Sequence, residues 1–348
     1  MNGNLVSPEE QNRISSFVRK ADKGLYEKYL LSADSISLIA GGGSDRCFYR
    51  VRKGAMSIVV MLSSFKDADF QNYLSVATFL KDLGIRVPTM YGFNREHHLV
   101  FMEDVGDVSV YRKCQEGMGE DEIRYWYQEI LGTLAIMQVQ GGRNWEKCTA
   151  LRERTFDYSA LRWETAYFQE YFLRKYLNIS TGEDQDLIQE FEALAGRIAR
   201  EPLHFMHRDF QSQNIMLCDG AVRILDFQGA RRGLLQYDLA SLLKDCYIVL
   251  SDNVVKTLIT FYLHQVDEQG IIINDEEGFY DTLDLAGLQR NMQALGAFSY
   301  LSLMKGKTWF KQYIPAGVHH LAKTLQRRSD FPCLRTLIEK VCEAGLPT

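Results

Sequence analysis

The sequence predicts an α+β protein with two lobes: a β-rich first lobe over residues 1–104 and a mostly helical second lobe over residues 105–348. A length of 348 residues is sufficient for two hydrophobic cores. Short alternating and β-branched segments gather before residue 104, whereas apolar residues recur at helical spacing over most of the remainder. One β-type segment interrupts the second lobe, at residues 215–225, where two short strands flank Asp219-Gly220.

The composition excludes several classes of protein. A hydrophobic content of 46% and a charged content of 24% are typical of globular proteins, and the net charge of −5 predicts no nucleic-acid or membrane partner. No apolar run approaches the roughly 20 residues that span a bilayer, and the N-terminal segment lacks the apolar stretch of a secretory signal. Seven cysteines without a C-x-x-C pair indicate reduced thiols and a cytoplasmic location. The sequence leaves the oligomeric state open.

The β-rich lobe has two expected helices and five expected strands. A helix is expected over residues 7–31 and another over 69–83, and the expected strands are 36–40, 47–51, 57–62, 89–93 and 98–103.

A glycine-rich turn is the first notable feature of this lobe. The turn Gly41, Gly42, Gly43 and Ser44 joins the first two strands. Because glycine has no Cβ, backbone N–H groups can approach an anion closely there. The turn could therefore cover nucleotide phosphates, although a tight turn without a ligand explains it too.

The last strand of the first lobe ends at the expected boundary between the lobes. Backbone groups of Met102, Glu103 and Val105 could hydrogen-bond the edge of an adenine base at this position. An ordinary exit from a strand into a loop explains the same pattern equally well.

Helical periodicity predicts most of the second lobe. The expected helices cover residues 120–137, 158–176, 187–198, 239–250, 254–266, 285–304, 318–328 and 333–344. A few polar side chains stand inside these apolar patterns and could face a substrate: Arg162, Glu164, Gln289, Arg290 and Asn291. A solvent-facing position is the simpler interpretation of the last three.

The most informative segment is residues 203–228, LHFMHRDFQSQNIMLCDGAVRILDFQ. A hairpin over residues 215–225 would fold Asp226 back toward Asp209 and Asn214, although these lie seventeen and twelve residues earlier. Two carboxylates and a carboxamide offer the oxygen ligands that Mg²⁺ prefers. A polar loop followed by an incidental hairpin is the alternative.

Charged side chains follow this segment. Arg231 and Arg232 could contact a phosphate or an acidic group of a substrate, or lie in solvent. Asp238 could cap the next helix, or it could reach His207 or Arg208 and brace the polar loop.

Together these motifs resemble the aminoglycoside phosphotransferase and choline kinase group, the small-molecule kinases of the protein-kinase-like fold. The resemblance covers nearly the whole chain, through GGGSDRCFYRV, FMED, HRDFQSQN, ILDFQ and YDLASLL. Within the group, the segments HRDFQSQNIML, ILDFQGARRGLLQYDLASLLKDCY and LQRNMQALGAFSYL are most similar to bacterial anomeric kinases of the cell-wall amino sugars N-acetylmuramate and N-acetylglucosamine. The resemblance implies a bilobal kinase fold and phosphoryl transfer from ATP (or another NTP) to a small-molecule hydroxyl.

The resemblance also implies roles for individual residues. Asp209 would be the catalytic base, and Asn214 and Asp226 would be the Mg²⁺ ligands. Residues 41–44 would form the phosphate loop and residues 102–105 the adenine hinge.

The substrate expected from the resemblance is a neutral or acidic sugar. Arg231 and Arg232 disfavour the cationic substrates of aminoglycoside and amino-alcohol kinases, and a kinase of that kind is the first alternative function.

One departure from the family pattern concerns the nucleotide. Met61 stands where most relatives carry the lysine that grips the α- and β-phosphates, and Arg46, Lys53 or Lys66 could replace that lysine. The amino-sugar kinases are expected to lack the lysine as well, which favours an active enzyme. A nucleotide-binding pseudokinase is the second alternative.

Overall fold

The computed structural model describes residues 4–39, 46–180 and 184–347. The chain divides into two compact units. The first unit comprises Met1–Ser109 and Ile215–Gln228, and the second comprises Val110–Asn214 and Gly229–Thr348. The Gly41–Ser44 turn, expected to cover nucleotide phosphates, lies outside the described residues.

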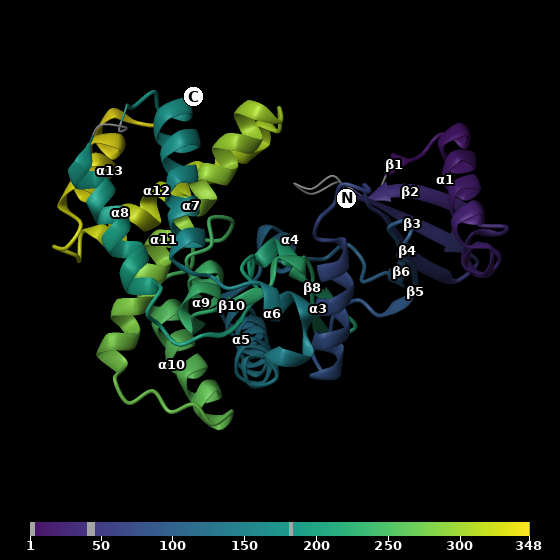
Figure 1. Ribbon diagram of the computed structural model, residues 1–348, viewed down its shortest axis with the longest axis horizontal. Coiled ribbons are helices and arrows are strands. Elements are labelled where there is room, and N and C mark those ends of the chain that lie inside the picture. Colours follow the sequence, from purple (N-terminus) through teal and green to yellow (C-terminus); the bar gives the residue numbers. More distant parts are fainter. Residues whose placement is uncertain (1–3, 40–45, 181–183, 348) are drawn as a thin grey trace. The chain divides into compact units, whose positions relative to one another are not determined.

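The first unit is built on a six-stranded antiparallel sheet in the order β1-β2-β3-β4-β6-β5 (Figure 1). Its strands are β1 (Asn4–Leu5), β2 (Ser35–Ile39), β3 (Cys47–Lys53), β4 (Met56–Leu62), β5 (Met90–Asn94) and β6 (Leu99–Glu103). Successive side chains of a strand point to opposite faces. Ile58 and Val60 of β4 therefore join one hydrophobic core, while Val59 and Met61 point to the other face.

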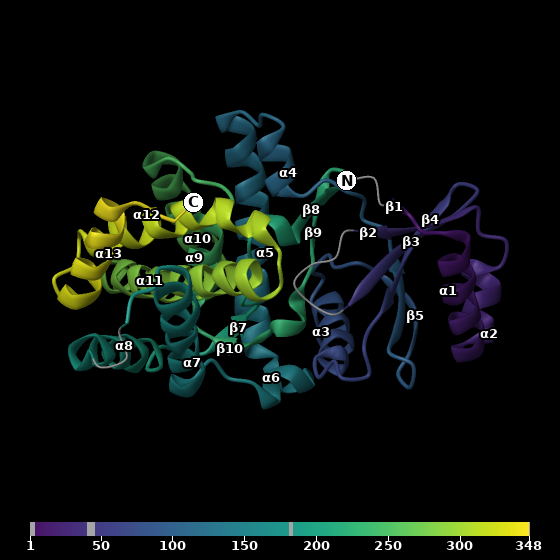
Figure 2. The same cartoon turned by 90° about the horizontal axis from the view of Figure 1, so that it is seen from above.

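Helices cover both faces of this sheet (Figure 2). On one face α1 (Pro8–Ala21) contributes Ile14 and Val18 to the core that contains Ile58. On the other face lies α3 (Phe70–Asp82), from which the Tyr73 hydroxyl contacts the Met102 sulfur at 3.3 Å.

The helix expected over residues 7–31 is interrupted. Asp22 ends α1, and its carboxylate accepts the Leu25 N–H at 2.9 Å, which caps the short helix α2 (Lys23–Leu25). A π-helical turn, Tyr26–Leu30, follows. A capping aspartate favours a new helix start over continuation of the first helix.

A hairpin from later in the chain belongs to the first unit. Strands β8 (Ile215–Cys218) and β9 (Ala221–Ile224) pair around Asp219-Gly220, as the sequence predicts, and both turn residues have positive φ. Backbone hydrogen bonds anchor both strands: the Leu217 N–H donates to the Val108 carbonyl at 2.8 Å, and the Ile224 N–H donates to the Arg86 carbonyl at 2.9 Å.

The second unit is mostly helical (Figure 1). Its helices are α4 (Val110–Gln115), α5 (Glu120–Arg143), α6 (Thr149–Glu153), α7 (Tyr158–Phe168), α8 (Gln185–Ile198), α9 (Leu235–Leu243), α10 (Asp252–Glu268), α11 (Glu276–Met304), α12 (Ile314–Leu325) and α13 (Pro332–Ala344). Helix α11 packs against α7, α9 and α12. Every residue from Leu285 to Met292 is therefore buried, as expected for a helix surrounded by other helices.

The helix expected over residues 239–250 is wrong in its bounds. Helix α9 begins at Leu235 and ends at Leu243. Two residues later the Asp245 carboxylate accepts the Tyr247 N–H at 3.0 Å, a local bond that competes with a further helical turn. The sequence also did not predict the two-stranded sheet of β7 (His204–Met206) and β10 (Arg231–Gly233).

The predicted α+β class is confirmed by this architecture, with the sheet in the first unit and the helices mainly in the second. Among the described residues, no helix is long and apolar enough to cross a membrane.

Candidate active site

Asp209 lies on the loop after β7, and a buried carboxylate holds the backbone just before it. Asp238, which is fully buried in the first turn of α9, accepts the His207 N–H at 2.6 Å and the Arg208 N–H at 2.8 Å. Leu234, not Asp238, is the N-cap residue of α9. Of the two positions that the sequence allowed for Asp238, the structure has the one that contacts the polar loop.

Arg208 adopts an unusual backbone conformation next to Asp209. Its φ is 81°, a region that is costly for a residue with a side chain. Two carboxylates hold it there: Asp238 accepts its N–H, and Glu164 lies 3.2 Å from its guanidinium Nη2. Such strain is kept where the surroundings over-determine it, which marks this loop as a candidate site.

Asp245 is a second buried carboxylate that sequence reasoning missed. It accepts the Ser212 N–H at 2.9 Å as well as the Tyr247 N–H. The loop thus has a buried carboxylate on either side of Asp209. A carboxylate two residues after the apolar run of α9 was the signal that could have revealed it.

Arginine side chains set the charge state of Asp209. Burial raises the pKa of Asp209, but the positive charges of Arg208, Arg290 and Arg231 outweigh this effect and hold the pKa below its usual value. The side chain is 31% exposed, and the Arg290 guanidinium lies 3.9 Å from its Oδ1 atom. Asp209 is therefore an ionised and partly exposed carboxylate at neutral pH, and such a group can accept a proton.

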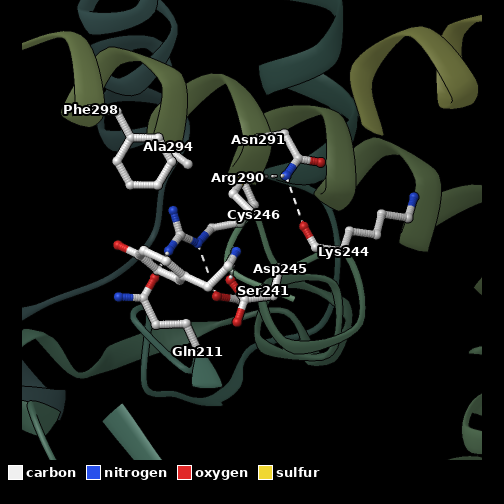
Figure 3. A pocket seen from close by; sticks show the side chains of 10 residues that line it. Gln211, Ser241, Lys244, Asp245, Cys246, Arg290, Asn291, Ala294 and Phe298 are labelled. Carbon is white, nitrogen blue, oxygen red and sulfur yellow. Dashed lines mark hydrogen bonds between the residues drawn. The ribbon is translucent and has the colours of Figure 1, made fainter. Parts of the chain in front are cut away.

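Arg290 is held rigidly on α11 (Figure 3). Its Nε donates to the Ser241 hydroxyl at 2.9 Å, and its Nη2 donates to the Gln211 carboxamide oxygen at 2.8 Å. The pocket around it has a volume of only about 10 Å³, roughly one water molecule, so the side chains themselves fill it. The solvent-facing interpretation of Gln289, Arg290 and Asn291 is wrong, because all three are buried.

Glu164 supplies the negative charge that balances part of this arginine cluster. It is 1% exposed on α7, and its Oε2 accepts the Tyr237 hydroxyl at 3.0 Å and the Gln289 amide at 3.2 Å. Together with the Arg208 contact, these bonds engage Glu164 inside the second unit.

The two neighbouring arginines of β10 contact different groups. The Arg231 Nε donates to the Gly229 carbonyl at 3.1 Å, and the Arg231 charge is among those that lower the pKa of Asp209. The Arg232 guanidinium lies 4.3 Å from the centre of the Trp145 ring. Since adjacent residues of a strand point in opposite directions, the two guanidinium groups have different surroundings, and that of Arg231 lies 6.0 Å from the centre of the Phe156 ring.

Asp226, in the first unit, also has a strained backbone. It follows β9 with a φ of 61°, and the Gln228 amide donates to its Oδ1 at 2.7 Å. In the hairpin, Ile215, which follows Asn214 in the chain, pairs with Ile224, two residues before Asp226.

The donor chemistry of Asn214 and Asp226 is compatible with Mg²⁺. No group of three or more His, Cys, Asp or Glu side chains gathers as a metal site within the described ranges. Mg²⁺ does not need one, because it keeps several waters and binds through one or two protein oxygens together with substrate phosphates. The carboxylate of Asp226 and the carboxamide of Asn214 are ligands of this type.

The expected adenine hinge at the end of β6 is braced by Arg50 of β3. Arg50 is 3% exposed, and it binds Asp104 at 2.7 Å and Asp107 at 3.0 Å. Burial raises the pKa of Asp104, but the bonds from Arg50 and Ser57 outweigh it and lower the pKa below the usual value. The Glu103 carboxylate accepts the Thr89 N–H at 3.0 Å. The acidic side chains of the hinge are therefore engaged within the first unit.

Met61, at the position of the missing lysine, is fully buried and pairs with Phe48 and Val100. Of the cations that could replace that lysine, Lys53 donates to the Leu31 carbonyl at 2.6 Å. Lys66 is exposed.

Comparison with known proteins identifies the family. The pattern of the phosphotransferase enzyme family matches residues 35–271. The N-acetylmuramate/N-acetylglucosamine kinase of Neisseria meningitidis serogroup B is 26% identical over 322 residues, which cover 90% of this chain and 92% of that protein. The enzyme of the same name from Pseudomonas aeruginosa is 24% identical over 300 residues, 85% of each chain.

Solved structures of kinases share the fold. Choline kinase LicA from Streptococcus pneumoniae superposes with a TM-score of 0.63 at 14% identity, covering 90% of this chain and 99% of its own. The Plasmodium vivax ethanolamine kinase superposes with a TM-score of 0.59 at 15% identity, covering 96% and 93%. The family resemblance of the sequence motifs is thereby confirmed. Because the family pattern spans more than half of its length, the chain belongs to the phosphotransferase enzyme family and is a small-molecule kinase.

Proposed function

We propose that this kinase transfers the γ-phosphoryl group of ATP to the anomeric hydroxyl of an N-acetylated amino sugar. The observation that carries the proposal is Asp209, an ionised and accessible carboxylate on a loop held by buried carboxylates on both sides. The substrate class is suggested by the names of the relatives from Neisseria meningitidis and Pseudomonas aeruginosa. Since the reaction consumes ATP, we place it in the cytoplasm.

Asp209 would orient the attacking hydroxyl and accept its proton. A carboxylate with a lowered pKa is a weak base, but phosphoryl transfer passes through a loose transition state that needs little proton removal at an early stage. The anomeric hydroxyl is also more acidic than an ordinary alcohol. A rigidly positioned carboxylate is therefore sufficient as the acceptor.

The first unit would bind the nucleotide. Backbone groups of Met102, Glu103 and Val105 would contact the adenine. The Glu103 side chain would not, because its carboxylate already accepts the Thr89 N–H. Residues 41–44 would cover the phosphates. Asn214 and Asp226 would hold Mg²⁺, which when bound neutralises negative charge on the phosphates.

Arg231 would bind the sugar substrate. Three arginines near Asp209, with Glu164 as their buried countercharge, disfavour a cationic aminoglycoside or amino alcohol and favour a neutral or acidic sugar. Arg232, which lies over Trp145, is not part of this proposal.

A substrate panel tests the proposed function. Purified protein with ATP and Mg²⁺ is assayed for ADP release with N-acetylglucosamine, N-acetylmuramate, glucosamine, choline and kanamycin. We expect turnover with the N-acetylated sugars and none with the methyl glycoside of N-acetylglucosamine, which lacks the free anomeric hydroxyl.

Two results would contradict the proposal. Faster turnover of choline or kanamycin would establish the amino-alcohol or aminoglycoside alternative. ATP binding in a thermal-shift titration without turnover of any acceptor would establish a pseudokinase.

A further inference from the structure

The nucleotide phosphates need a positive charge that β4 does not supply. Kinases of this fold place a lysine there and orient it with a glutamate, whereas this chain has the buried Met61. Lys53 stands at the last position of β3, paired with Met56, and its ammonium group contacts the Leu31 carbonyl. It is therefore at the end of β3 remote from Cys47, the partner of Leu62.

Arg46 lies at the opposite end of β3, near Met61. In the register of the two strands Phe48 pairs with Met61 and Cys47 with Leu62, so Arg46 precedes this pairing by one residue. The positive charge of Arg46 influences the pKa of Tyr73 on α3, the helix on the Met61 face of the sheet. Burial raises the pKa of Tyr73, the Arg46 charge lowers it, and the Asp226 charge raises it. The Tyr73 ring also packs 4.9 Å from the ring of Phe227, the residue that follows the proposed metal ligand Asp226.

Asp67 orients the Arg46 guanidinium. The Arg46 Nε lies 2.7 Å from Asp67 Oδ2 and Nη2 lies 3.0 Å from Oδ1, with the two side chains 5% and 15% exposed. The Ser63 hydroxyl and the Asp69 N–H also donate to Asp67. Burial raises the pKa of Asp67, but the bonds from Arg46 and Ser63 outweigh it, so the pKa is lowered and the carboxylate stays ionised.

This two-point contact leaves part of the guanidinium available. Asp67 takes up Nε and Nη2, and Nη1 donates to no residue in the described part of the chain. A guanidinium held on one edge can present its remaining N–H groups to a phosphate in a defined direction.

We infer that Arg46, positioned by Asp67, binds the α- and β-phosphates of the nucleotide in place of the missing lysine. The inference rests on the proposed use of ATP and adds the residue pair that recognises its phosphates. Asp67 acts through Arg46 and does not itself contact the nucleotide.

Binding of ADP and adenosine tests the inference, because adenosine has the base but no phosphates. Titration calorimetry of Arg46→Met should show ADP affinity reduced roughly 10- to 100-fold, the range for a lost charged hydrogen bond, with adenosine affinity unchanged. Arg46→Lys should retain part of the ADP affinity. Lys53→Met, a matched loss of positive charge in the same unit, should leave both affinities unchanged.

Second-site variants separate phosphate binding from a structural role. Arg46→Met combined with Met61→Lys should recover ADP affinity, since it returns the cation to β4. Asp67→Asn keeps the arginine and should reduce ADP affinity less than Arg46→Met does. If the Arg46–Asp67 ion pair were only structural, its loss would lower the melting temperature and weaken the binding of ADP and adenosine equally. That result would overturn the inference.

Failure of the inference can be distinguished from failure of the proposed function. If the wild-type protein binds no ATP and phosphorylates no acceptor, the proposed function is wrong. If the wild type is active and Arg46→Met keeps full ADP affinity, only the role of Arg46 is wrong.

Discussion

The Asp209 loop and the hinge end of β6 are both held by buried polar side chains, but in opposite ways. Around Asp209, the carboxylates of Asp238 and Asp245 accept backbone N–H groups. At the hinge, the Arg50 guanidinium binds the side chains of Asp104 and Asp107.

The difference separates two kinds of rigidity. A carboxylate bound to N–H groups fixes the main chain itself, which suits a proton acceptor that must stay in position. An arginine between two carboxylates mainly fixes side chains, here with one further bond to the Gly106 carbonyl at 3.3 Å, and it depends on the charge of every partner. Substitutions in the two regions should therefore have different consequences for activity and stability.

The largest expected effect is on Asp209, the proposed proton acceptor of the backbone-held loop. Asp209→Asn should lower kcat by roughly 10²- to 10⁴-fold, the usual contribution of a general base, without changing ADP affinity. Steady-state ADP release and calorimetry measure the two quantities. Asp219→Asn, in the exposed hairpin turn, is the matched control and should keep the wild-type rate. An Asp209→Asn protein with wild-type kcat would remove Asp209 from the chemistry.

Loss of the charge at the hinge should mainly affect stability. Arg50→Met leaves Asp104 and Asp107 without their buried partner, which should cost about 3–5 kcal/mol of unfolding free energy. Urea denaturation followed by circular dichroism measures this change. A loss of less than about 1 kcal/mol would show that solvent already screens the pair. Arg52→Met, on the same strand but exposed, serves as the control.

Removal of a backbone-binding carboxylate should reduce activity as well as stability. Asp238→Ala leaves the buried N–H groups of His207 and Arg208 without this acceptor, at about 1–3 kcal/mol for each group. The displaced loop should also lower kcat, whereas Arg50→Met should act on stability at unchanged kcat per folded molecule. Equal kcat losses in both variants would abolish the proposed distinction. Asp186→Ala, on the exposed surface of α8, should change neither quantity.

Substrate recognition provides a smaller effect. Arg231→Met should raise KM for N-acetylmuramate roughly 10-fold, because the carboxylate of this sugar loses a charged hydrogen-bond donor. KM for uncharged N-acetylglucosamine should change less. Arg232→Met is the natural control, since its side chain lies over Trp145. Equal effects of the two substitutions on both sugars would contradict a specific role of Arg231.

The smallest expected effect is on the pH dependence. The positive charge of Arg290 favours the ionised form of Asp209 and so holds its pKa down. Arg290→Met should raise that pKa, and the acidic limb of the pH profile of kcat/KM should therefore move to higher pH. An unchanged limb would mean that a group other than Asp209 controls it. Profiles of the wild type and of Arg143→Met, an exposed arginine at the end of α5, provide the reference.

Features that depend on local interactions were predictable from the sequence, whereas features that depend on contacts between distant residues were not. The hairpin around Asp219-Gly220 was predictable because a two-residue turn and its flanking strands are local features. The interruption at Asp22 was missed, since the apolar periodicity continues across it and only the cap bond reveals the break. The burial of Arg290 was also missed, because the periodicity of one helix does not show how many neighbours surround it.

The sequence by itself determined the α+β class, most helices and strands, the hairpin and the family, because these depend on periodicity, turn chemistry and motif spacing. Only the tertiary structure decided that Asp238 and Asp245 hold the Asp209 loop, that Arg231 and Arg232 point apart, and that Arg46 pairs with Asp67. These contacts join residues from different elements. Their energies depend on burial and on the direction of individual hydrogen bonds, which no local pattern in the sequence specifies.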